Sequence, residues 1–402
     1  MMTPERSSGS WLILLGALVA LGPLAIDMYL PAFPAIEAQM GRGAPLTLSG
    51  FFMGLVVGQL IYGPVSDHLG RRAPLLFGVG VYLLASLACS FSTSMHQLIA
   101  LRFIQALGAC SCMVISRAIV RDRCHARAAA QAQSRLMLVM GAAPILAPSL
   151  GSYLLHHFNW PGIFILQALA ATMALIAAWW GLEETHPLAS RQHTPDWHEV
   201  PAVFLALLRE RRFMGFALSS TLVMAGMFAY ITGSPYLLMQ VLGVSPQHYA
   251  LIFSTNAGAF ILSSQLNAYW LRQYDMTYLL NRAIHIPVLT ALAMLLMTWS
   301  GYQSLYGLLT LLFIYMGSLG CIVPNAVAAA LATQGSQRAG TAAALMGALQ
   351  FALATLVSSS MASWHRQDAF PVVSTMELCA LLAWLINRWL LRPHFPRLPL
   401  ES

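Results

Sequence analysis

Long apolar runs separated by short polar segments make up most of the chain. A run of about 20 apolar residues is enough for one helix to cross a bilayer. Twelve runs meet that length, at residues 11–33, 46–67, 73–92, 97–119, 133–155, 161–182, 213–238, 247–270, 278–300, 303–326, 339–361 and 369–391. The pattern predicts an all-α polytopic membrane protein with twelve transmembrane helices. The first run is too long for a cleaved signal sequence, so we expect it to remain as a span.

The longest polar interruption, residues 183–212, divides the predicted spans into two sets of six. We therefore expect an N-terminal six-helix bundle over 1–182, a linker over 183–212 and a C-terminal six-helix bundle over 213–402. With an even number of spans, both termini lie on the same side of the membrane. The ends and loops on that side contain seventeen arginines, whereas the loops on the other side contain two, Arg42 and Arg366. The positive-inside rule then predicts cytoplasmic termini. The linker is too short for an ATPase domain, so pumping would have to draw on an ion gradient.

Composition supports the membrane class and excludes several kinds of site. Hydrophobic residues make up 58% of the chain and charged residues 9%, and all 21 Lys+Arg residues are arginine. The absence of lysine excludes a P-loop lysine and a Schiff-base lysine. The six cysteines lack CxxC spacing, and neither HExxH nor GxSxG occurs, so we expect no disulfide framework, metal, cofactor or enzyme active site. The net charge of +7 marks topology rather than nucleic-acid binding.

A charged turn between the second and third predicted spans is the most specific motif. Asp67 lies in the last turn of the incoming helix, Gly70 permits the reversal, and Arg71 and Arg72 hold the turn on the positive side of the membrane. Counted from Gly63, the spacing Gly-x-x-x-Asp-x-x-Gly-Arg-Arg resembles the signature loop of the major facilitator superfamily. An ordinary positively flanked turn is the alternative.

Two charged residues inside the spans are candidates for chemistry, because an ionisable group within the bilayer is expensive and by default marks a functional site. Asp27 lies about 24 Å along the first span, in a core roughly 30 Å thick. Arg102 lies about 22 Å from the same edge. We expect the two charges to be coupled electrostatically, directly or through water, so that a bound substrate changes the protonation of Asp27. The alternative for Asp27 is an interfacial acid.

The fifth predicted span carries Pro144 and Pro148 among small residues that include Ala147 and Gly151. Two prolines four residues apart remove backbone hydrogen bonds and bend a helix. Small residues let a neighbouring helix approach closely. The segment therefore predicts either a helix bent for function or a kinked packing helix.

Together these segments resemble the drug:proton antiporter branch of the major facilitator superfamily, and most of all its bicyclomycin/chloramphenicol-resistance (Bcr/CflA) subfamily, over nearly the whole chain. The similar segments are Asp27-Met28-Tyr29-Leu30-Pro31, Arg102-Phe103-Ile104-Gln105, Arg117-Ala118-Ile119-Val120-Arg121-Asp122, Glu184-Thr185-His186-Pro187 and Met224-Ala225-Gly226-Met227-Phe228. The resemblance implies proton coupling through Asp27 and Arg102, and an antiporter motif made of Pro144, Ala147, Pro148 and Gly151. The chain departs from the family at Ala106 and Ser152, where glycine is usual, and at Pro161-Gly162, where Trp-Arg is common.

The resemblance also implies a conformational switch at the charged turn. In the family the acid matching Asp67 faces the positive N-terminus of the eleventh span, which here begins near Arg338, and nearby arginines. A carboxylate at a helix N-terminus is worth about 0.3–2 kcal/mol, enough to bias an equilibrium without locking it. The expected switch residues are Gly63, Asp67, Gly70, Arg71, Arg72, Arg117 and Arg121.

Several aromatic, methionine and amide side chains are candidates for an adaptable hydrophobic cavity, although packing is the commoner role for such residues. These candidates are Tyr29, Gln105, Met224, Phe228, Tyr230, Tyr236 and Asn325. Glu377, midway along the last span, is either a second titrating group or a buried packing acid.

The expected function is efflux of small, mostly hydrophobic antimicrobial compounds in exchange for protons, across a bacterial inner membrane. Alternating access of two bundles around a midplane site would perform it, in a monomer that contacts lipid, protons and substrate and no nucleic acid. An exporter of a metabolite such as an amino acid is the main alternative, and a proton-coupled importer shares the fold.

Overall fold

The computed structural model describes residues 10–124, 126–186, 200–301, 304–334, 339–363 and 369–391, and within these ranges the regular structure is helical throughout. The chain forms two compact units. Unit 1 comprises Met1–Trp197, Ile231–Ala257 and Gly347–His365, and unit 2 comprises His198–Tyr230, Gly258–Met346 and Arg366–Ser402. The predicted division at 1–182, 183–212 and 213–402 stays a prediction.

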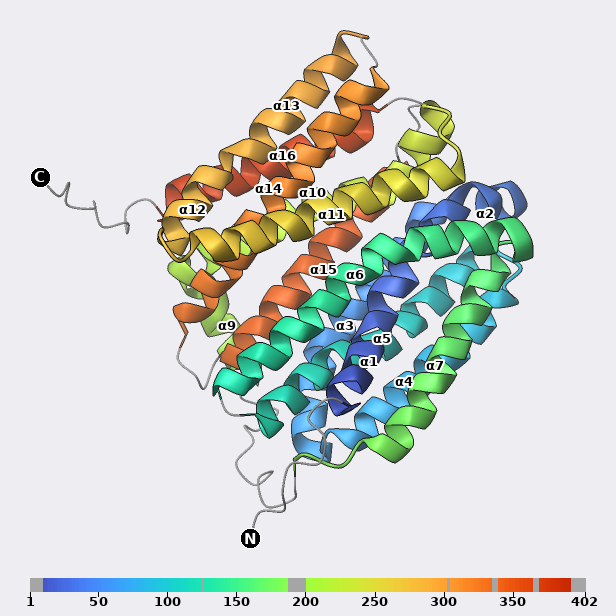
Figure 1. Ribbon diagram of the computed structural model, residues 1–402, viewed down its shortest axis with the longest axis vertical. Coiled ribbons are helices and arrows are strands. Elements are labelled where there is room, and N and C mark those ends of the chain that lie inside the picture. The colour runs from blue at the N-terminus through green and yellow to red at the C-terminus, as the bar shows by residue number, and fades with distance from the viewer. Residues whose placement is uncertain are drawn as a thin grey trace, which may run out of the picture. The chain divides into compact units, whose positions relative to one another are not determined.

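Unit 1 contains most of the first half of the chain. Its helices are α1 (Ser10–Asp27), η1 (Leu30–Ala32), α2 (Phe33–Met40), α3 (Ala44–Leu69), α4 (Arg72–Ser90), α5 (Met95–Arg123), α6 (Ala126–Phe158) and α7 (Pro161–Gly181). Helix α5 packs against α1, α3 and α4, while α7 packs against α4 and α1, and α1 also packs against α6 (Figure 1). Helix α5 therefore lies at the centre of this bundle, where its polar side chains meet several neighbours.

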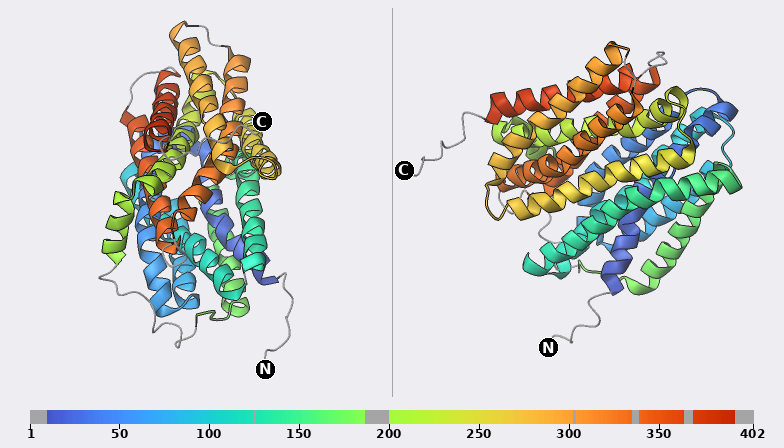
Figure 2. Two further views of the ribbon diagram at one scale, coloured as in Figure 1. Left: turned by 90° about the vertical axis from the view of Figure 1, so that its left-hand side faces the viewer. Right: turned by 45° about the horizontal axis from the view of Figure 1, so that its top comes forward.

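Unit 2 is built from later helices. These are α9 (Val200–Arg209), α12 (Met276–Ala283), α13 (His285–Trp299), α14 (Leu305–Ala332), α16 (Phe370–Ile386) and η3 (Asn387–Leu391), with parts of α10 (Arg211–Ser234), α11 (Pro246–Trp270) and α15 (Ala339–Ser363). The short η2 (Pro235–Val241) belongs to unit 1. Helix α13 packs against both α14 and α16 and lies beside α16 in the views of Figure 2.

The helices confirm the prediction of an all-α multi-pass membrane protein. Among the described residues, ten segments are long and apolar enough to cross a membrane. Two further helices, α6 and α11, coincide with the fifth and eighth predicted spans. On α7, Met173, Ile176 and Trp180 share one face and are 66%, 53% and 83% exposed. An exposed apolar stripe of this kind fits contact with lipid tails better than contact with water.

The first predicted span differs from the expectation, because its helix is interrupted. The run 11–33 was expected to be one helix, but α1 ends at Asp27, and a turn at Met28 and Tyr29 precedes η1. Pro31 gives the physical reason: it has no N–H to donate to the carbonyl of Asp27 four residues earlier, and its ring crowds that carbonyl. Asp27 therefore lies at a helix end, beside a break in the backbone.

Candidate functional site

Asp27 is buried at the C-terminal end of α1. Its side chain is 4% exposed, and it makes no hydrogen bond or ion pair with another residue in the described part of the chain. Helix α6 approaches the adjoining turn so closely that a Cβ at Gly151 would lie 2.0 Å from the Met28 carbonyl oxygen. Glycine at position 151 thus permits the contact between the antiporter motif and the residue next to Asp27.

Arg102 on α5 is fully buried and is held by hydrogen bonds and by contacts with aromatic rings. Its Nη1 donates to Gln105 Oε1 at 2.6 Å, and its Nη2 donates to the carbonyl oxygen of Ala25 at 2.9 Å. The guanidinium also lies over the rings of Phe51 and Tyr29, with Cζ at 4.3 and 4.8 Å from the ring centroids. Cation–π contacts of this kind stabilise a guanidinium that is removed from water. Its Nε has no hydrogen-bond partner among the described residues.

A buried chain of polar groups fixes Gln105, the main partner of Arg102. The Nε2 of Gln105 donates to Ser86 Oγ on α4 at 2.7 Å and to Gln167 Oε1 on α7 at 2.8 Å. Gln167 is 2% exposed and reaches α1 through the carbonyl of Leu24 at 3.5 Å. The chain therefore ties α1, α4, α5 and α7 together around Arg102. Sequence reasoning missed Gln167, although a lone amide in the apolar run 161–182 was a usable signal.

Asp27 and Arg102 are linked through the backbone of α1 and not by a direct ion pair. The guanidinium binds the Ala25 carbonyl, two residues before Asp27, and stacks on Tyr29, two residues after it. Among the described residues, Asp27 forms no ion pair with Arg102. The electrostatic coupling expected from the sequence stays a prediction.

The four residues of the predicted antiporter motif lie on α6. The helix runs from Ala126 to Phe158 without interruption, through both Pro144 and Pro148. Ser254 of α11 donates to the Ile145 carbonyl at 2.5 Å, in the turn between the two prolines. A proline removes the helical donor to the carbonyl four residues before it, here those of Met140 and Pro144, and the Ser254 bond to the neighbouring Ile145 carbonyl joins α11 to α6 at this point. Ala147 is fully buried.

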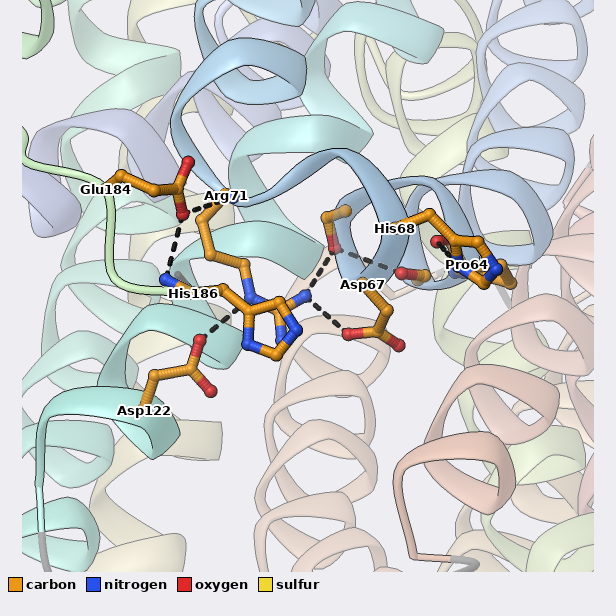
Figure 3. Close-up of polar contacts among 9 residues, drawn as sticks. Pro64, Asp67, His68, Arg71, Asp122, Glu184 and His186 are labelled. Atoms are coloured by element: carbon orange, nitrogen blue, oxygen red, sulfur yellow. Dashed lines mark hydrogen bonds and ion pairs between the residues drawn. The ribbon is translucent and has the colours of Figure 1, made fainter. Parts of the chain in front are cut away.

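The charged turn between α3 and α4 is a network centred on Arg71 (Figure 3). Gly70 has a φ of 90°, a conformation that side chains other than glycine rarely adopt, and the chain reverses there. Arg71 is 2% exposed and pairs with Asp67 through Nη1 and with Asp122 through Nε, at 2.5 and 2.8 Å. Burial lowers the pKa of Arg71, but the bonds to Asp122 and Asp67 outweigh it and leave the pKa above its ordinary value.

Glu184, which follows α7, closes this network from the other side. Its Oε1 accepts from the backbone N–H of Arg71 at 2.8 Å, and its Oε2 accepts from that of Arg72 at 3.1 Å. These N–H groups open α4, so the carboxylate acts as a cap and opposes the helix dipole. Arg72 extends to the Trp179 carbonyl at 2.6 Å. The end of α7 is thereby fastened to the start of α4.

The predicted switch residues are only partly brought together. Arg71, and neither Arg117 nor Arg121, is the ion-pair partner of Asp67 among the described residues. Arg338 lies outside the described residues, so a contact of Asp67 with that end of the eleventh span stays a prediction. A Cβ at Gly63 would meet open space. Sequence reasoning did not identify Asp122 and Glu184 as partners of Arg71, although both lie in the quoted motifs.

The cavity candidates are distributed over both units. In unit 1, Tyr29 is buried and its hydroxyl lies 3.1 Å from Thr47 Oγ1, Gln105 belongs to the polar chain, and Tyr236 is half-buried in η2. In unit 2, Met224, Phe228 and Tyr230 are buried on α10, and Asn325 pairs with Asn267 through both amides. Their role in a cavity stays a prediction.

Comparison with known proteins gives the family. The model of the family described as Major Facilitator Superfamily matches residues 14–359. The chain is 36% identical to "Uncharacterized MFS-type transporter YdgK" of Bacillus subtilis, over 92% of this chain and 93% of that one. It is 28% identical to "Bicyclomycin resistance protein homolog" of Haemophilus influenzae, over 96% of each chain. It is 31% identical to "Multidrug resistance protein MdtL" of Escherichia coli, over 60% of this chain and 61% of that one.

Solved structures agree on the fold. A bacterial homologue of the human lysosomal transporter Spinster, in an inward-facing and occupied conformation, aligns with a TM-score of 0.73 at 14% identity, over 98% of this chain and 100% of that one. This similarity supports the all-α major facilitator fold. The chain belongs to the Major Facilitator Superfamily, a family of transporters, and its relatives support the bicyclomycin/chloramphenicol-resistance branch that its motifs predict.

Proposed function

We propose that the protein exports small, mostly hydrophobic antimicrobial compounds across a bacterial inner membrane in exchange for protons, with both termini cytoplasmic. The names of two relatives support the substrate class, since one is a bicyclomycin resistance homologue and the other a multidrug resistance protein. Alternating access by the major facilitator fold is the transport mechanism, and the protein works as a monomer.

The observation that carries the proposal is the state of Asp27. Its carboxyl is buried and makes no hydrogen bond or ion pair within the described residues, beside a backbone segment that Arg102 holds. An ionised carboxylate without a partner is costly inside a membrane, so this acid binds a proton when it is enclosed and releases it when water reaches it. A group of this kind couples a proton gradient to a conformational change.

The geometry suggests how the exchange proceeds. While Asp27 is protonated, Arg102 remains bound to the Ala25 carbonyl and Gln105. When Asp27 loses its proton, the new negative charge attracts the guanidinium and competes with its bond to Ala25. That competition loosens the break after α1, where α6 contacts Met28 through Gly151. Substrate binding on one side of the membrane and proton binding on the other then drive opposite steps of one cycle.

One proton is sufficient for useful efflux of a neutral compound. Entry of a proton down a potential of about 100 mV yields about 2.3 kcal/mol, and each pH unit adds about 1.4 kcal/mol. The sum of roughly 3.7 kcal/mol supports a concentration ratio of about 500.

The test uses inverted membrane vesicles from cells that express the protein, with an acidic interior reported by a pH-sensitive dye. Bicyclomycin, chloramphenicol, a sulfonamide, a lipophilic cation and cysteine are added in turn. At least one antimicrobial compound is expected to collapse the gradient with the wild type and not with Asp27→Asn. Cysteine tests the metabolite alternative in the same assay.

The matched control is Asp275→Asn, which removes an acid that caps α12 through the N–H of Thr277. Asparagine caps helices about as well as aspartate, so this variant is expected to transport normally. Equal transport by Asp27→Asn and the wild type, at equal expression, would overturn proton coupling at Asp27. Collapse of the gradient by cysteine alone would overturn the substrate class.

A further inference from the structure

The acids inside the membrane-spanning segments fall into two kinds. Among the described residues, the candidate spans contain five acids, which are Asp27, Glu37, Asp67, Asp122 and Glu377. Glu37 accepts from two backbone N–H groups at the start of α3, each at 3.1 Å, and Asp67 and Asp122 both pair with Arg71. Asp27 and Glu377 make neither a hydrogen bond nor an ion pair with another described residue. Glu377 therefore resembles Asp27 in its surroundings, and the proposed function leaves it without a role.

Glu377 lies on α16 within unit 2 and is 6% exposed. Its Oε2 is enclosed without a hydrogen-bond partner, and so is the hydroxyl of Tyr315 on α14. With Asn387 Nδ2 on η3, unit 2 contains three enclosed polar atoms without partners among the described residues, whereas most buried polar groups are satisfied. A hydrogen bond between Glu377 and the Tyr315 hydroxyl is not present in this structure, so forming it would require one of the two side chains to move.

Glycine at position 226 provides the room for the tyrosine. A Cβ at Gly226 of α10 would lie 2.1 Å from the Tyr315 hydroxyl oxygen and 3.5 Å from Cys379 Cβ, on the same helix as Glu377. Helices α10, α14 and α16 therefore meet around the hydroxyl, and any side chain at position 226 would displace it. Gly226 lies in the segment Met224-Ala225-Gly226-Met227-Phe228, which resembles the family, but the resemblance predicts no role for the glycine.

We propose that Glu377 is a second proton-binding site, separate from Asp27, and that the Tyr315 hydroxyl donates a hydrogen bond to its carboxylate once the proton has left. Binding forms one O–H bond on the carboxyl, and release breaks it and returns the proton to water. The protonated acid is the stable form while the site is enclosed, since a lone carboxylate there is costly. The tyrosine makes the ionised form attainable without a cation.

The charged and titratable groups on the neighbouring elements do not provide a counter-charge. They are Arg211, Arg212 and Tyr230 on α10, His285 on α13, Tyr306, Tyr315 and Cys321 on α14, Cys379 on α16 and Arg388 on η3. His285 and Arg388 lie against the ring of Trp384, with 6.3 Å between ring centroids and 5.4 Å from Cζ to the centroid. Among the described residues neither forms an ion pair with Glu377.

The inference extends the proposed function by adding a second exchanged proton, and its first test needs neither substrate nor gradient. Infrared difference spectra of the purified protein between alkaline and acidic pH report the C=O stretch of protonated carboxyl groups. Asp27→Asn is expected to keep a titrating band that the double variant Asp27→Asn/Glu377→Gln loses. A band unchanged by Glu377→Gln would overturn the proposal, whatever transport shows for Asp27.

Tyr315→Phe separates a proton site from a packing acid. It keeps the ring and removes the hydroxyl, and it is expected to shift the pH midpoint of the Glu377 band. Tyr306→Phe is the matched control, because that residue lies on the same helix and is 82% exposed. Equal midpoints for the two variants would overturn the role of Tyr315. Glu377→Asp keeps a carboxyl and is expected to retain a titrating band. If Glu377→Gln does not fold, Glu377→Asp is the variant to measure in its place.

Transport provides a second readout. For a neutral compound at zero potential, the limiting concentration ratio changes about tenfold per pH unit for each coupled proton. The wild type is expected to show about a hundredfold change per pH unit and Glu377→Gln about tenfold. Equal slopes for the wild type and Glu377→Gln would contradict a second coupled proton. Absence of transport by the wild type would instead contradict the proposed function. The infrared test of Glu377 would still apply, because it does not depend on transport.

Discussion

Arg71 Nε donates to Asp122 Oδ2 at 2.8 Å, which joins the turn between α3 and α4 to the last turn of α5. The two residues are 51 positions apart, and the arginine is almost fully buried. A side chain of the turn is thereby anchored to the central helix of the bundle.

Arg71→Ala is expected to destabilise the protein by about 3 kcal/mol, near the lower end of the range for breaking a buried ion pair. The lower end applies because Asp67 is 34% exposed, so water can solvate its carboxylate after the arginine is removed. Thermal unfolding of the purified protein in detergent measures this loss. Arg282→Ala is the control, because Arg282 lies over an exposed tyrosine ring and is expected to contribute little. A loss no larger than that of the control would show that the network does not stabilise the fold.

Asp67→Ala is expected to slow transport while substrate binding is kept. Arg71 retains its bond to Asp122 in this variant, so the turn stays folded. The predicted role of the Asp67 carboxylate is to bias the resting conformation, and such a bias is worth about 0.3–2 kcal/mol. Equilibrium binding of substrate and initial transport rates are measured side by side. Equal losses of binding and rate would argue against a conformational role.

Gly151→Ala is expected to reduce transport and to cost about 1–3 kcal/mol, the usual range for overpacking. The added Cβ would meet the Met28 carbonyl at 2.0 Å and push α6 away from the break after α1. Gly80→Ala on α4 is the matched control, since nothing lies within 4 Å of its Cβ position. Alanine favours a helix over glycine by about 1 kcal/mol, so the control is expected to be neutral or stabilising. Similar melting temperatures for the two variants would count against the close contact.

Gln167→Leu is expected to weaken transport by releasing Gln105, the partner of Arg102. An unsatisfied buried amide costs about 1–3 kcal/mol, and leucine preserves most of the volume. A double-mutant cycle with Gln105→Leu is expected to give a coupling energy of about 0.5–3 kcal/mol in thermal unfolding. Additive effects of the two substitutions would mean that Gln167 does not act through Gln105.

The sequence predicted the helices well, because apolar length is a strong signal, but it missed their interruptions. The run 11–33 is uniformly apolar apart from Asp27, so hydropathy alone does not reveal the break after α1, whereas Pro31 does. The predicted linker 183–212 was treated as polar chain, yet α9 occupies Val200–Arg209. This helix is mostly apolar, but at ten residues it is too short to give a span-length signal.

The site was predicted as individual residues more than as contacts. Asp27, Arg102 and the charged turn were found because charges are rare in apolar runs. Their partners were harder to foresee: Glu184 lies 113 residues from Arg71, and Gln167 lies 62 residues from Gln105. Pairing over such separations is set by the tertiary packing of helices, which one sequence without an alignment does not reveal.

The raised pKa of Arg71 has a consequence for how the protein responds to acidity. A guanidinium in that position keeps its charge at every pH that a cell meets. The arginine that joins α3, α4 and α5 therefore stays cationic over that whole range. Glu184 binds the backbone of the same turn and extends the connection to the chain segment that follows α7. In the proton exchange proposed above, this arginine would contribute no change of charge, and the changes would fall on carboxyl groups such as Asp27.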